Sequence, residues 1–103
     1  MSQQNKPAEN STTLHLEKTE DYRDSYANSV QVRMSVWDFQ LIFGTMHPQA
    51  ADEVTVRNFQ GVYLSPQQAK ALLGVLGENV QQYERAFGQI ALEPNFNPPG
   101  PVH

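Results

Sequence analysis

Two consecutive stretches of alternating apolar and polar residues constrain the fold more than any other feature of the sequence. In the first stretch, residues 29–35, every second residue is apolar: Val30, Val32 and Met34. In the second stretch, which follows at once, the alternating apolar residues are Trp37, Phe39, Leu41 and Phe43. A period of two residues is typical of strands with one buried face. The sequence therefore predicts two adjacent strands.

The same alternation also predicts how these two strands pair. If residues 35–38 form the turn, antiparallel pairing brings apolar residues together three times: Met34 with Phe39, Val32 with Leu41, and Val30 with Phe43. Each such cross-strand pair stabilises a sheet by roughly 0.2–1 kcal/mol. A shift of one residue would place every apolar side chain opposite the polar face of its partner. The pattern therefore predicts a hairpin in this register.

A third strand is predicted from Glu53 to Leu64, after a loop over residues 47–52 that contains Pro48. The apolar period of this strand is interrupted. One face begins with Val54 and Val56, is interrupted by the polar Asn58 and Gln60, and continues with the apolar Val62 and Leu64. The aromatic residues Phe59 and Tyr63 occupy the other face. Either a bulge near Asn58 or Gly61 switches the faces, or both faces are partly covered.

A long helix follows the third strand. Ser65 is a suitable N-cap, Pro66 occupies the first helical position, and Gln68 completes a capping box. Gly88 is placed to end the helix in the left-handed α conformation. Between them, apolar residues recur at helical spacing along one stripe: Ala69, Leu72, Leu73, Leu76, Val80, Tyr83 and Phe87. We therefore expect an α+β fold, an antiparallel three-stranded sheet packed by one helix over residues 66–87, with the stripe in its core.

Several separated motifs resemble those of a known family. They are Tyr-Ala-Asn-Ser-Val at residues 26–30, Trp-Asp-Phe through Phe-Gly at 37–44, Leu-Ser-Pro-Gln-Gln-Ala-Lys-Ala-Leu-Leu at 64–73, Glu-Asn-Val-Gln-Gln-Tyr-Glu at 78–84, and Phe-Gly-Gln-Ile at 87–90. In order and spacing they are similar to a family of short bacterial and archaeal proteins that is classed only as a domain of unknown function. The resemblance implies a small prokaryotic domain and brings no catalytic residues with it.

The two ends differ in composition from the middle of the chain. Residues 1–25 are mostly polar, charged or small, which predicts a disordered tail. Residues 93–103 contain four prolines and predict a second disordered tail. A single domain over residues 26–92 lies between them. Whether the alternating Leu14 and Leu16 add an edge strand to it stays open at this level.

Composition excludes several kinds of chemistry. The chain has no cysteine, so disulfides, thiolate metal sites and a cysteine nucleophile are excluded. The three histidines, His15, His47 and His103, have no second ligand at a suitable spacing, so we expect no metal site and no cofactor. The carboxylates Glu78 and Glu84 do not converge as an acid–base pair. We therefore expect no enzyme, and the absence of a long apolar run or leader predicts a cytoplasmic protein without a membrane segment.

These exclusions favour an interaction module. A domain of about 65 residues buries little surface by itself, and one helix can cover only one face of the sheet. We therefore expect a homodimer, and a further protein partner stays open. Its interface is predicted on the uncovered face, at Ile42, Phe59 and Tyr63, with Arg57 beside them. Edge pairing of the first or third strand is the alternative geometry. The alternative is a single-stranded nucleic-acid-binding protein using that open face. Seven basic against eleven acidic residues make this alternative unfavourable.

Overall fold

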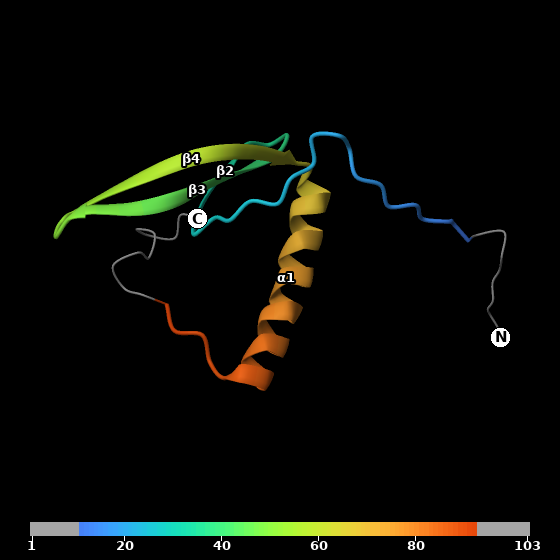
Figure 1. Cartoon of the computed structure of the whole chain (residues 1–103). Coiled ribbons are helices and arrows are strands. Elements are labelled where there is room, and N and C mark those ends of the chain that lie inside the picture. The colour runs from blue at the N-terminus through green and yellow to red at the C-terminus, as the bar shows by residue number, and fades with distance from the viewer. Residues whose placement is uncertain (1–10, 93–103) are drawn as a thin grey trace.

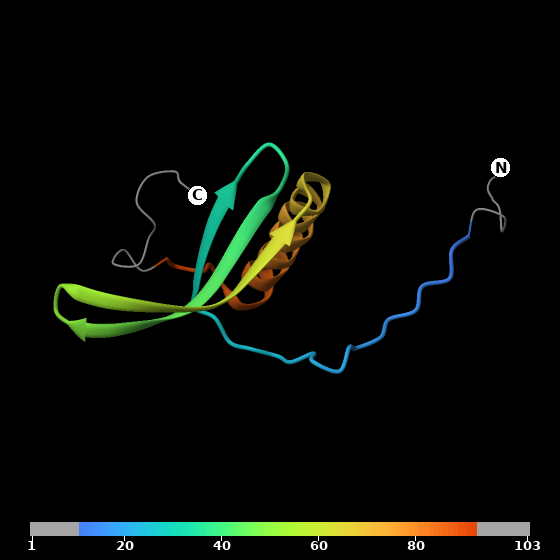
Figure 2. The same ribbon diagram turned by 90° about the horizontal axis from the view of Figure 1, so that it is seen from above.

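The computed structural model describes residues 11–92, which form three antiparallel strands followed by one helix. The strands are β2 (Ser29–Met34), β3 (Phe39–Ala50) and β4 (Glu53–Leu64), and the helix is α1 (Pro66–Phe87). The sheet has the order β2-β3-β4, and its twist is visible in Figure 2. The α+β prediction is confirmed. The predicted proline-rich tail over residues 93–103 and the first ten residues of the N-terminal tail lie outside the described residues.

The first hairpin has the register that the alternation predicts. Val30 pairs with Phe43, Val32 with Leu41, and Met34 with Phe39. In the turn, the Ser35 hydroxyl accepts hydrogen bonds from the backbone N–H groups of Trp37 and Asp38, at 3.0 and 3.2 Å. The Ser35 hydroxyl in turn donates to the Asp38 carboxylate at 3.2 Å. The serine side chain therefore satisfies the backbone donors of this turn.

The second hairpin is longer than the sequence predicts. The loop expected over residues 47–52 is wrong for its first four residues, because β3 continues to Ala50 and only Ala51 and Asp52 form the turn. Pro48 is tolerated inside the strand because β2 begins at Ser29, opposite Gly44, and does not reach it. Beyond that point β3 has only β4 as a neighbour, and proline is acceptable on such an edge.

A bulge in β4 resolves the interrupted period of this strand. Phe43 pairs with Gln60 and Gly44 with Asn58, so Phe59 is the extra residue. Of the two interpretations left open by the sequence, the bulge near Asn58 is confirmed. It moves Val54 and Val56 to the face opposite that of Val62 and Leu64, since successive pairs alternate between the faces.

The register therefore defines two faces of the sheet. What we call the apolar face carries Val30, Val32, Met34, Phe39, Leu41, Phe43, Val62 and Leu64. What we call the mixed face carries Gln31, Arg33, Gln40, Ile42, Gly44, Gly61 and Tyr63. The apolar face has Gln60, the partner of Phe43, as a polar member. The mixed face combines a cation and amides with Ile42 and Tyr63, and Val54 and Val56 lie on the same side beyond the bulge.

Helix α1 has the predicted bounds, with Ser65 as its N-cap and Gly88 as its C-cap. The Ser65 hydroxyl accepts a hydrogen bond from the Gln68 N–H at 3.1 Å, and Pro66 occupies the first helical position. At the other end, the Gly88 N–H donates to the Glu84 carbonyl oxygen, and the Ile90 N–H donates to the Glu84 carboxylate at 3.0 Å. Gly88 has φ 104° and ψ 169°, so its positive φ is confirmed, but the predicted left-handed α conformation is wrong.

Replacing Ser65 by alanine is expected to lower the free energy of unfolding by roughly 0.5–2 kcal/mol, because the first turn of α1 loses its side-chain acceptor. Urea denaturation monitored by circular dichroism measures this loss. Ser65→Thr is the control, since it keeps a hydroxyl at the cap and should retain most of the stability. Equal stability of Ser65→Ala and the wild type would contradict a capping role.

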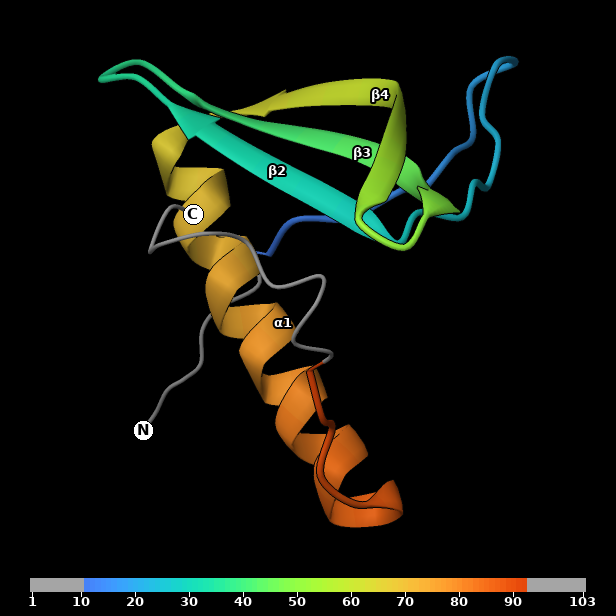
Figure 3. The same cartoon turned by 90° about the vertical axis from the view of Figure 1, so that its left-hand side faces the viewer.

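Helix α1 meets the sheet only where it begins and then diverges from it (Figures 1 and 3). Ala69 and Leu72, in the first two turns, are half-buried, whereas the large apolar residues of the later turns are exposed. Among the described residues, no hydrophobic side chain is fully buried. The expectation that the stripe forms the core of a single chain is therefore wrong. The one-residue connection, Ser65, is the physical reason, because it leaves no length of chain for the helix to return over its own sheet.

Residues 11–28 precede the sheet without forming a strand, and Leu14 and Leu16 are exposed. This segment joins the sheet at Asn28. The Asn28 N–H donates to the Gly44 carbonyl oxygen at 3.1 Å, and its side-chain oxygen accepts from the Met46 N–H at 2.8 Å. Through these two hydrogen bonds Asn28 continues the contact between β2 and β3 beyond the first residue of β2.

Candidate interaction surface

Two exposed apolar surfaces stand out in the described chain, one on the sheet and one on the helix. On the apolar face the β2 residues are exposed, with Met34 at 77% and Val30 at 50%, whereas the apolar β3 and β4 residues are half-buried. Exposed apolar patches of this kind mark interaction sites. The apolar face is therefore a candidate interface.

The second surface is the apolar stripe of α1, which consists of Leu73, Leu76, Val80, Tyr83 and Phe87. Leu73 and Phe87 are 75% and 76% exposed, and Leu76 is 55% exposed. Tyr83 and Phe87 stack on each other at 5.0 Å between ring centroids, which gives the end of the stripe a continuous aromatic surface. Residues three and four apart share one side of a helix, so the stripe is a single surface.

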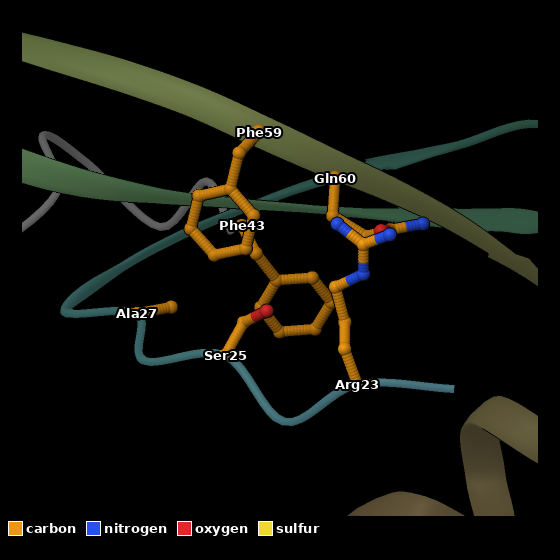
Figure 4. A pocket seen from close by; sticks show the side chains of 6 residues that line it. All are labelled: Arg23, Ser25, Ala27, Phe43, Phe59 and Gln60. Atoms are coloured by element: carbon orange, nitrogen blue, oxygen red, sulfur yellow. The ribbon is translucent and has the colours of Figure 1, made fainter. Parts of the chain in front are cut away.

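The structure separates the four predicted interface residues. Ile42 and Tyr63 lie on the mixed face, as expected. Phe59 does not join them, because the bulge turns its ring toward Phe43 (Figure 4). Arg57 pairs with Thr45, one step beyond the Gly44–Asn58 pair, and so shares the side of Phe59.

A shallow pocket of about 290 Å³ lies beside this bulge. Its lining consists of Arg23, Ser25, Ala27, Phe43, Phe59 and Gln60 (Figure 4). Residues 23–27 pass along the sheet on the side toward which both phenylalanine rings point (Figure 4). Arg23 is the only ionisable residue in the lining, so the pocket holds no pair of groups that could act as acid and base.

Clustered metal ligands and shifted pKa values are the usual signs of a reaction centre. No group of three or more His, Asp or Glu side chains within residues 11–92 is arranged to hold a metal ion. The His47 ring lies within hydrogen-bond distance of the Thr45 hydroxyl, at 2.9 Å. The hydrogen bond from the Tyr22 hydroxyl to the Asp24 carboxylate, at 2.6 Å, raises the pKa of Tyr22, because it favours the protonated phenol. This pair is local and exposed.

Sequence reasoning overlooked the two largest surfaces, because it assigned their residues to the core. The short connection between β4 and α1 is the sequence feature that could have indicated these surfaces. Only Ser65 separates the end of β4 from the start of α1, whereas strand-to-helix loops that let a helix pack back on its sheet have about 2–6 residues. The same count would have indicated that the helix leaves its own sheet.

The fold and the surface define a small α+β protein in which a three-stranded antiparallel sheet and one projecting helix each expose apolar side chains. A family model described as "Protein of unknown function (DUF3467)" matches residues 1–92, and the chain belongs to this family. This agrees with the resemblance drawn from the motifs. No curated protein matches the chain, and no solved structure matches it. In residues 11–92 no helix has the length and apolar character to cross a membrane.

Proposed function

We propose that this protein is a homodimeric interaction module without catalytic activity. The observation that supports the proposal is the lack of any fully buried hydrophobic side chain among residues 11–92. Burial of apolar surface is the dominant favourable term in folding, and ordering each residue costs about 1–2 kcal/mol in backbone entropy. A chain with regular strands and a capped helix but no core needs a second surface to complete it.

The symmetry of a homodimer supports a second copy as the partner. Each chain supplies the same surfaces, so a twofold contact covers the same apolar patch on both chains at once. The proposal that the module lacks catalysis is supported by the pocket at the bulge, whose lining contains Arg23 and no second ionisable side chain. The net charge of -4 supports a protein contact over the nucleic-acid alternative.

Sedimentation equilibrium of the full chain across the micromolar range tests the proposal. The expected result is twice the monomer mass of 11.6 kDa, with a mass that does not depend on salt. A concentration-independent monomer would overturn the homodimer. A gel-shift assay with single-stranded oligonucleotides tests the alternative, and we expect no complex.

Two single substitutions distinguish which face of the sheet carries the interface. Met34 on the apolar face and Tyr63 on the mixed face are similarly exposed within one chain, at 77% and 65%. We expect Met34→Glu to raise the dimer dissociation constant at least about tenfold, because a carboxylate becomes buried without a partner. Tyr63→Glu should change it less than about threefold. Dissociation by Tyr63→Glu alone would place the interface on the mixed face, at Ile42 and Tyr63.

A further inference from the structure

We propose that helix α1 of one chain packs against the apolar face of the second chain, and reciprocally, so that two copies exchange helices to build two shared cores. This inference rests on the proposed homodimer and specifies which surfaces meet within it. A dimer could also form sheet to sheet or helix to helix, and each chain would then keep one of its apolar surfaces uncovered.

The connection between β4 and α1 supports exchange. Leu64 is the last residue of β4 and Pro66 is the first of α1. Ser65 between them is held in an extended conformation, at φ -64° and ψ 157°, and its carbonyl oxygen accepts the first helical hydrogen bond from Ala69. With Pro66 restricting the backbone as well, the direction of the helix is set where the strand ends. The helix therefore diverges from its own sheet, as Figure 3 shows.

The two surfaces are chemically matched. The stripe on α1 carries no charge, and the opposite side of the helix carries Glu78, Gln81 and Arg85. The apolar face carries aliphatic and aromatic side chains from all three strands. None of the residues that define the two surfaces carries a charge at neutral pH, so packing one against the other leaves no unpaired charge among them.

The size of the contact is close to that of a stable interface. A helix of 22 residues is about 33 Å long and about 10 Å wide, which gives a footprint of roughly 330 Å². Each chain takes part twice, once through its helix and once through its sheet, for a total of roughly 660 Å². Stable interfaces bury about 800 Å² on each partner. The roughly 660 Å² of a reciprocal exchange approaches this area, whereas a single contact of helix with helix supplies half of the exchange area, roughly 330 Å².

Cross-linking between differently tagged chains tests the exchange, and the lack of cysteine in the sequence makes engineered thiols unique. One chain carries Val32→Cys on the apolar face. The other carries Leu73→Cys, Leu76→Cys or Val80→Cys on the stripe. The two are unfolded together, refolded, purified through both tags and treated with a short bis-maleimide. The matched control replaces Val32→Cys by Arg33→Cys, its neighbour on the mixed face.

We expect the heterodimer to cross-link with Val32→Cys, for at least one of the three helix positions, and not with Arg33→Cys. A dimer of wild-type mass that cross-links at none of the three positions, or equally with Arg33→Cys, would overturn the exchange and leave the homodimer intact. A monomer of each variant and of the wild type in sedimentation would overturn the homodimer as well. Failure of the inference and failure of the proposed function are therefore distinguishable.

Discussion

Replacing Leu76 by aspartate is expected to dissociate the dimer and to unfold most of the chain at micromolar concentration. Leu76 lies at the middle of α1 and is 55% exposed within one chain. Burying a leucine contributes roughly 1.5–3 kcal/mol, and a twofold dimer loses this contribution at two sites. The total of about 3–6 kcal/mol corresponds to a roughly 100- to 20,000-fold weaker dimer. Sedimentation equilibrium and far-ultraviolet circular dichroism measure the two effects.

Gln82→Asp is the matched control for this substitution. It introduces the same carboxylate into the same helix, but on the side away from the stripe. Exposed positions tolerate such changes within about 0.5 kcal/mol, so the dimer should persist. If α1 were exposed in solution as it is in one chain, Leu76→Asp would be equally harmless. Two indistinguishable variants would therefore argue against any partner on the helix.

Replacing Gly44 by alanine is expected to lower the free energy of unfolding by about 1–3 kcal/mol, because the bulge leaves no room for a side chain there. A Cβ atom at Gly44 would lie 2.7 Å from the backbone carbonyl oxygen of Arg57 and 2.5 Å from the side-chain oxygen of Asn58. The carbonyl belongs to the paired strand and cannot move without disturbing the ladder. Each kcal/mol lowers the melting temperature of a domain of this size by roughly 4–8 °C, which calorimetry resolves.

Gly61→Ala is the control in the same sheet and on the same face. Its Cβ would meet only the side-chain amide of Gln40, at 3.1 Å, which is the end of a flexible side chain and can rotate away. We expect a change within about 0.5 kcal/mol. Equal destabilisation by both substitutions would mean that loss of glycine in the sheet, and not the close approach at the bulge, is responsible.

The sequence by itself determined the elements that depend on local periodicity. The two alternating stretches, with the turn at residues 35–38, specified the β2–β3 register, since a shift of one residue would oppose apolar and polar faces. The bounds of α1 followed from the side-chain chemistry of Ser65 and Pro66 at one end and from Gly88 at the other. These features act over a few residues, so their physical causes are all present in the local sequence.

Only the tertiary structure decided how these elements are placed relative to one another. The bulge at Phe59, which moves this ring to the side of Phe43, depends on pairing between strands that are distant in sequence. Pro48 could enter β3 because β2 ends its pairing at Gly44. The exposure of the stripe on α1 depends on the orientation of the helix relative to the sheet, which the backbone at Ser65 sets. An apolar pattern determines that a surface becomes buried, but it does not determine whether the same chain or a second copy covers it.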